Sequence, residues 1–204
     1  MENKKLEKIL LVEDNEKYRK AARDVITKKY SHFDTKENLE EALPIYENYD
    51  FVLIDGFFPV AKKFGKKQAS LATDFLDKIG DSGEKNMGMN YMLGVMLGED
   101  NAPLGLYLAE KLKNEGINNY LIVTAADHHV AEYGLMRNYS SAKNLNLFIE
   151  DLVRSGNSKD KKEYWENALI KMEEIYNSNS KSLKGGKENG KGNKWKNRTY
   201  FKNS

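Results

Sequence analysis

The alternation of short apolar runs with stretches whose apolar residues recur at helical spacing most constrains how this chain can fold. The apolar runs predict strands buried on both faces, over residues 8–14, 50–55, 119–125 and 146–151, with a weaker strand over 31–35. The amphipathic stretches predict helices over 15–30, 36–49, 103–116 and 159–177, with a short helix before the last strand. Strands and helices that alternate in this way form an α/β fold, a doubly wound five-stranded parallel sheet.

The alternation breaks directly after the third expected strand, between Val60 and Pro103. This segment is too long for an ordinary connection between two elements. Its front part, around residues 70–79, is typical of a helix, and its back part is rich in glycine and methionine. We expect an insertion over about 61–102 that covers or borders the end of the third strand and moves more than the core.

Acidic and hydroxyl side chains stand at the ends of the expected strands. Glu13 and Asp14 end the first strand, Asp55 ends the third, and Thr124 lies near the end of the fourth. In a doubly wound sheet, ligands bind beyond the carboxyl ends of the strands. Three carboxylates that meet there repel one another, and a divalent cation that prefers oxygen ligands, such as Mg²⁺, relieves the repulsion.

Four motifs resemble the receiver domain of two-component response regulators, in the order in which that family has them. They are ILLVEDN (9–15), FVLIDGFFP (51–59), APLGLYLAEKLK (102–113) and LIVTA (121–125). The resemblance covers residues 8 to about 176, and it implies a flavodoxin-like receiver fold with a long insertion after the third strand. It also implies a cytoplasmic protein of a phosphorelay, which receives a phosphoryl group from a histidine kinase or another phosphodonor protein.

The resemblance assigns a role to each matching residue. Asp55 would be the phosphoacceptor, and Thr124 would be the switch hydroxyl, with the small Ala125 beside it. Magnesium would be held by Glu13, Asp14, Asp55 and the backbone carbonyl of Phe57.

One position of the family pattern is not matched. The family places a lysine, usually followed by proline, at the end of the last strand, where this chain has Glu150 and Asp151. Arg154 and Lys143 are the cations that could take the place of that lysine. A carboxylate beside a phosphoryl group is unfavourable, so a second reading stays open: a pseudo-receiver that acts as a protein interaction module without phosphorylation.

A third reading is an enzyme that uses the acidic residues and magnesium. A phosphatase of the haloacid dehalogenase type or a Toprim-like nuclease would need a second aspartate two residues after the first, and Phe57 stands there. We therefore expect a phosphoacceptor rather than a hydrolase.

His128 and His129 follow the fourth strand. Adjacent helical residues point about 100° apart, so either both histidines are solvated or one of them reaches the site.

The C-terminal residues differ in charge from the rest of the chain. Residues 177–204 hold eight Lys or Arg and one Glu, a charge of +7, whereas the preceding 176 residues hold 25 basic and 30 acidic groups. A tail rich in Gly, Asn, Ser and Lys does not build a core and is expected to be disordered. Its aromatic residues, Trp195, Tyr200 and Phe201, make single-stranded nucleic acid a possible partner.

The chain has no cysteine, no apolar run of membrane-spanning length and no signal peptide before the first strand. We therefore expect a cytoplasmic protein that makes no contact with a membrane.

Overall fold

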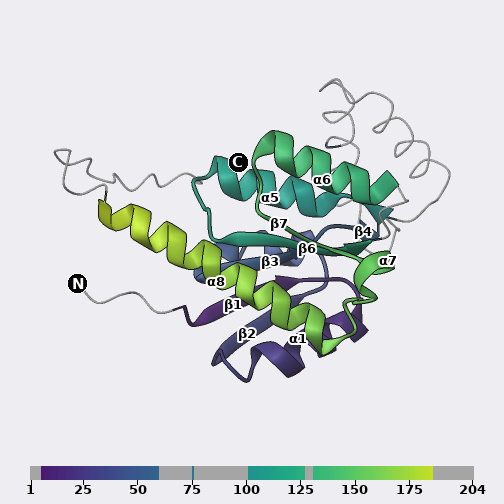
Figure 1. Ribbon diagram of the computed structural model, residues 1–204. Coiled ribbons are helices and arrows are strands. Elements are labelled where there is room, and N and C mark those ends of the chain that lie inside the picture. The colour runs from purple at the N-terminus through teal and green to yellow at the C-terminus, as the bar shows by residue number, and fades with distance from the viewer. Residues whose placement is uncertain (1–5, 60–74, 76–100, 127–130, 186–204) are drawn as a thin grey trace, which may run out of the picture.

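The computed structural model describes residues 6–59, 75, 101–126 and 131–185, and it is an α/β fold built on a five-stranded parallel sheet (Figure 1). The strands are β1 (Lys8–Val12), β2 (His32–Lys36), β3 (Phe51–Asp55), β6 (Tyr120–Ala126) and β7 (Leu147–Asp151). They lie in the order β2-β1-β3-β6-β7. This order matches that of flavodoxin-like sheets, and the expected all-parallel α/β sheet is confirmed.

The register of the strands aligns their carboxyl ends at one edge of the sheet. Val12 of β1 lies opposite Ile54 of β3, and Asp55 lies opposite Val123 of β6. The residues that follow these positions, Glu13 and Thr124 among them, therefore belong to the same edge as Asp55.

Helices cover both faces of the sheet, as a doubly wound fold requires (Figure 1). α1 (Glu16–Ile26) and α8 (Lys162–Gly185) lie on one face. α2 (Leu39–Ala42), α5 (Leu104–Asn114) and α6 (Ala131–Lys143) lie on the other. A 3₁₀ turn, η1 (Tyr46–Asn48), and a short helix, α7 (Leu152–Ser155), complete the helical elements of the described residues.

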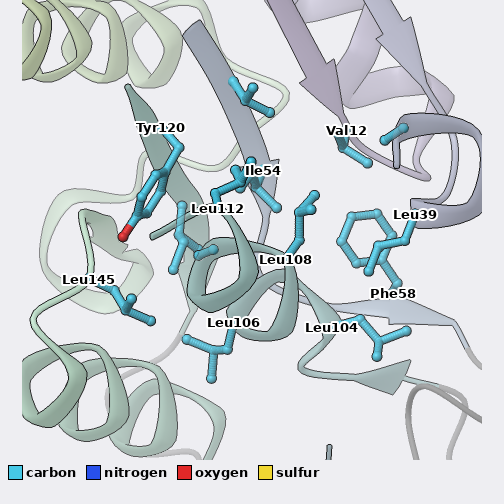
Figure 2. Packing of buried hydrophobic residues seen from close by; sticks show 14 of the residues in the cluster. Val12, Leu39, Ile54, Phe58, Leu104, Leu106, Leu108, Leu112, Tyr120 and Leu145 are labelled. Carbon is cyan, nitrogen blue, oxygen red and sulfur yellow. The ribbon is translucent and has the colours of Figure 1, made fainter. Parts of the chain in front are cut away.

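Each face of the sheet has its own apolar core, because successive strand residues point to opposite sides. Leu10, Val52 and Ile54 pack against α2, α5 and α6. Figure 2 shows part of this cluster, with Leu108 and Leu112 of α5 among the strand residues. Residues that alternate with these, such as Leu11 and Leu53, pack instead against α1 and α8.

The second helix is much shorter than residues 36–49, the range that its apolar spacing predicts. Asn38 caps its start by accepting a hydrogen bond of 3.0 Å from the backbone N–H of Glu41. The helix ends at Ala42 because Pro44 has no N–H to continue the ladder of hydrogen bonds. The chain then makes the 3₁₀ turn η1 before it enters β3.

The last helix begins three residues later than expected and ends well beyond residue 177, where we placed its end and the start of the tail. α8 continues to Gly185, and Asn179 holds this extension by donating from its side chain to the carbonyl of Asn118 and to the side-chain oxygen of Asn119. No helix in the described part of the chain, α8 included, is both long and apolar enough to cross a membrane. Trp195, Tyr200 and Phe201 lie outside the described residues. The structure therefore does not test the prediction that they bind nucleic acid.

The segment that follows β3 starts and ends beside the same edge of the sheet. β4 (Phe58–Pro59) pairs antiparallel with β5 (Asn101–Ala102). Phe75 is buried and packs edge-on against the rings of Tyr107 in α5 and Tyr139 in α6. The other residues of 60–100 lie outside the described residues. The predictions that this segment contains a helix and that it moves more than the core fall on these residues.

Candidate functional site

Three carboxylates meet at the carboxyl edge of the sheet, as the strand ends predict. One carboxylate oxygen each from Glu13, Asp14 and Asp55 lies within 4.8 Å of the other two. Glu13 is fully buried, Asp55 is nearly so, and Asp14 is half-buried. The parallel sheet therefore brings together acidic groups that are about 40 residues apart in the sequence.

The turn after β1 is held by contacts with the elements around it. The guanidinium of Arg19 in α1 donates to the carbonyl of Glu13 at 2.8 Å and to that of Asp14 at 2.7 Å. The N–H of Asn15 donates to the Glu13 carboxylate at 3.1 Å, and the Asn15 side chain caps α1. These contacts hold the backbone at Glu13 and Asp14 and orient the Glu13 carboxylate.

A lysine that sequence analysis missed completes the site. Lys159 lies in the turn between α7 and α8, and only 4% of it is exposed. Its ammonium forms ion pairs with Glu13 and, at 2.7 Å, with Asp55. The last strand itself ends in Glu150 and Asp151, and the chain supplies the cation of the site from beyond that strand.

The two cations considered from the sequence lie elsewhere. Arg154 in α7 pairs at 3.3 Å with Asp151, the last residue of β7, and the side chain of Arg154 is 79% exposed. Lys143 is in the last turn of α6, over the ring of Tyr139 and near the opposite edge of the sheet. Lys159 stands among several other lysines in "SKDKK", so local sequence gave no signal that would single it out.

The charges of Glu13, Asp14, Asp55 and Lys159 act on one another. Burial and the neighbouring charge of Asp55 raise the pKa of Glu13 to about 8, although Lys159 opposes the shift. Burial and Asp55 also raise the pKa of Asp14. Burial alone would lower the pKa of Lys159, but the charges of Asp55 and Glu13 outweigh it and raise that pKa above its usual value. Lys159 therefore stays charged, and Glu13 takes up a proton more readily than an ordinary glutamate.

The raised pKa of Glu13 predicts how the free energy of unfolding depends on pH. Between its usual pKa of 4.5 and about 8, the folded protein binds a proton that the unfolded chain has released. The free energy of unfolding should therefore fall as pH rises through this interval. Denaturant titrations across the interval should show a shallower slope for Glu13→Gln than for the wild type.

The control for this prediction is Glu16→Gln, which changes an exposed glutamate in the first turn of α1. This variant should keep the slope of the wild type. Equal slopes in the wild type and Glu13→Gln would show that Glu13 does not titrate in the folded protein within this interval.

Two glycines allow the segments around Asp55 to approach closely. A Cβ atom on Gly56 would lie 3.2 Å from the hydroxyl oxygen of Thr124 and 2.8 Å from the terminal methyl of Met136. A Cβ atom on Gly105 in α5 would lie only 1.9 Å from the carbonyl oxygen of Asp55. The turn after Asp55 is therefore packed tightly between β6 and the start of α5, with the buried Thr124 beside it.

The remaining residues named from the sequence are placed as follows. Phe57 is half-buried in the turn between β3 and β4, and Ala125 pairs with Glu150 in the ladder between β6 and β7. Asp151 accepts a hydrogen bond from the N–H of Val153 and so caps α7. His128 and His129 lie outside the described residues.

The donor set of the site suits a hard divalent cation. Its three carboxylates offer only oxygen ligands. The raised pKa of Glu13 reflects its burial first and then the negative charge of Asp55, and a bound cation would offset that charge. The molecule is thus an α/β protein with an acidic, lysine-containing site at the carboxyl edge of its sheet. Comparison of the chain with protein-family models, with curated proteins and with solved structures found no match.

Proposed function

We propose that this chain is a receiver-like signalling module of a phosphorelay, in which Asp55 accepts a phosphoryl group from a phosphodonor protein. The observation that carries the proposal is the contact of 2.7 Å between Lys159 and Asp55, in a cluster that also holds Glu13 and Asp14. A cation that contacts a carboxylate can neutralise the negative charge of a phosphoryl group attached to that carboxylate.

The chain's own residues account for the transfer step. An oxygen of Asp55 attacks the phosphorus of a phosphohistidine, and the P–N bond breaks with its electron pair leaving on the imidazole. An acyl phosphate forms on Asp55. The ammonium of Lys159 offsets negative charge on the phosphoryl oxygens, and the Thr124 hydroxyl, on the neighbouring strand, donates a hydrogen bond to one of them.

Magnesium fits this site and is part of the proposal. Glu13, Asp14, Asp55 and the carbonyl of Phe57 would hold the ion, which supplies charge neutralisation for phosphoryl transfer when it is bound. Because burial and the charge of Asp55 raise the pKa of Glu13, Glu13 becomes a better ligand as pH rises.

The proposal predicts that the full chain gains the mass of one phosphoryl group when it is incubated with acetyl phosphate and Mg²⁺. Intact-mass spectrometry should detect this gain in the wild type, and chelation of Mg²⁺ should abolish it. Asp55→Asn should remain unmodified because it lacks the attacking carboxylate. Asp24→Asn, which changes an exposed carboxylate on α1, should be modified like the wild type.

Two outcomes would contradict the proposal. An unmodified wild type would favour the alternative of an interaction module that needs no phosphoryl group. The same gain of mass in Asp55→Asn would place the phosphoryl group on another residue.

A further inference from the structure

The position of Lys159 raises the question of what holds it. It belongs to neither a strand nor a helix, since α7 ends at Ser155 and α8 begins at Lys162. A lysine side chain has many rotamers, so an ammonium on a loose turn would visit Asp55 only part of the time. The backbone of Lys159 therefore needs an anchor of its own.

Trp165 provides that anchor. Its indole N–H donates a hydrogen bond of 2.6 Å to the carbonyl oxygen of Lys159, and this bond is buried. Trp165 is itself fully buried, and its ring packs edge-on against Tyr164 at 5.2 Å between centroids. Because the ring lies in the core between α8 and the sheet, it ties the carbonyl of Lys159 to a rigid part of the molecule.

The other end of Lys159 is held by different elements. Its ammonium contacts Asp55 at the end of β3 and Glu13 after β1, and it lies 5.3 Å from the ring centroid of Tyr18 in α1. The side chain thus spans from the anchor on α8 to the acidic site. A shift of the carbonyl at one end moves the ammonium away from Asp55 at the other.

We infer that Trp165 is a positioning residue, which sets the reach of Lys159 to Asp55 through the hydrogen bond to the Lys159 carbonyl. The inference rests on the proposed function where it concerns phosphoryl transfer. Loss of the indole N–H leaves the ammonium less often at Asp55, and Asp55 accepts a phosphoryl group more slowly.

The test compares four full-length proteins: the wild type, Trp165→Phe, Lys159→Met and the double variant. The rate of phosphorylation by acetyl phosphate and Mg²⁺ should fall about two- to tenfold in Trp165→Phe, the range expected for one buried hydrogen bond. In the Lys159→Met background, the same substitution should change the rate by less than about twofold, because the ammonium that it positions is gone. Equal factors in both backgrounds would overturn the inference.

Tyr164→Phe is the matched control for the loss of a polar hydrogen from the same turn of α8. The Tyr164 hydroxyl is buried and has no hydrogen-bond partner within the described part of the chain. Its removal should change the rate by less than about twofold, since no hydrogen bond is lost. A fall as large as that in Trp165→Phe would assign the effect to packing of the aromatic rings and would also overturn the inference.

Thermal unfolding of the same four proteins separates this inference from the proposed function. If the wild type is not phosphorylated, the proposed function fails, but the anchoring of Lys159 can still be measured. Trp165→Phe should lower the midpoint of thermal unfolding by about 2–4 °C in the wild-type background. In the Lys159→Met background it should lower the midpoint by clearly less, because the hydrogen bond of Trp165 and the ion pairs of the Lys159 ammonium hold the same turn. If Trp165→Phe lowered the midpoint equally in both backgrounds, the hydrogen bond and the ion pairs would act independently, and the inference would be wrong.

Discussion

Replacement of Lys159 by methionine should lower the free energy of unfolding by about 3–5 kcal/mol, the usual cost of removing one partner from a buried ion pair. The substitution leaves Glu13 and Asp55 buried beside each other with no cation between them. Glu13 can take up a proton, so the loss should grow as pH rises. Urea titration at several pH values measures both the loss and its dependence on pH.

Magnesium should partly restore the stability of Lys159→Met. A divalent cation can take over the neutralising role of the ammonium, and at a concentration about 100 times its Kd it adds about 2.7 kcal/mol to the stability of the folded state. This gain should disappear in Lys159→Met combined with Asp55→Asn.

Lys162→Met is the control for the loss of a lysine from this part of the chain. Lys162 pairs with Glu166 at 2.7 Å on the exposed surface of α8, and both side chains are about half exposed. Such a pair contributes about 0.3–0.5 kcal/mol, so the variant should stay close to the wild type. A loss below about 1 kcal/mol in Lys159→Met would contradict the burial of its ammonium, since an exposed pair costs no more than that.

Gly105→Ala should destabilise the protein by about 3 kcal/mol, at the upper end of the usual cost of overpacking. The new methyl group would meet the carbonyl oxygen of Asp55, a backbone atom that cannot turn aside as a flexible side chain can. Relief requires α5 to move away from β3, and this movement breaks the hydrogen bond of 3.2 Å from the Gly105 N–H to the Gly56 carbonyl. Asp55 should shift with it, and Mg²⁺ should bind more weakly.

Gly134→Ala is the matched control because it makes the same change in helix α6. A Cβ atom on Gly134 meets nothing within 4 Å. Alanine is favoured over glycine in a helix interior by about 0.5–1 kcal/mol, so this variant should be slightly more stable than the wild type. If Gly105→Ala unfolded at the same denaturant concentration as Gly134→Ala, the close approach of α5 to Asp55 would be refuted.

The acidic part of the site could be predicted because it follows from the parallel sheet. Glu13 and Asp55 come directly after or at the end of strongly apolar strands, and the carboxyl ends of parallel strands share one edge. The same argument placed Thr124 at that edge. These predictions needed no knowledge of how distant side chains pack, only the types of the elements and their order.

The helix boundaries were harder to predict because they depend on contacts outside the helix. Pro44, which cannot continue a helix, stands inside the expected range 36–49, but the end of the helix at Ala42 was not predicted. The extension of α8 to Gly185 runs through a sequence rich in serine and asparagine that indicates a tail, and it is supported by Asn179, which reaches the backbone before β6. Local propensity does not contain that contact.

By itself, then, the sequence determined the parallel α/β sheet and the meeting of Glu13, Asp14 and Asp55 at one of its edges, because both follow from hydrophobic periodicity and strand order. Only the tertiary structure decided which cation joins them. Lys159 reaches Asp55 because α8 packs on the sheet and Trp165 fixes the turn that precedes it. This arrangement depends on packing between residues far apart in the chain, and no local pattern distinguishes Lys159 from the lysines beside it.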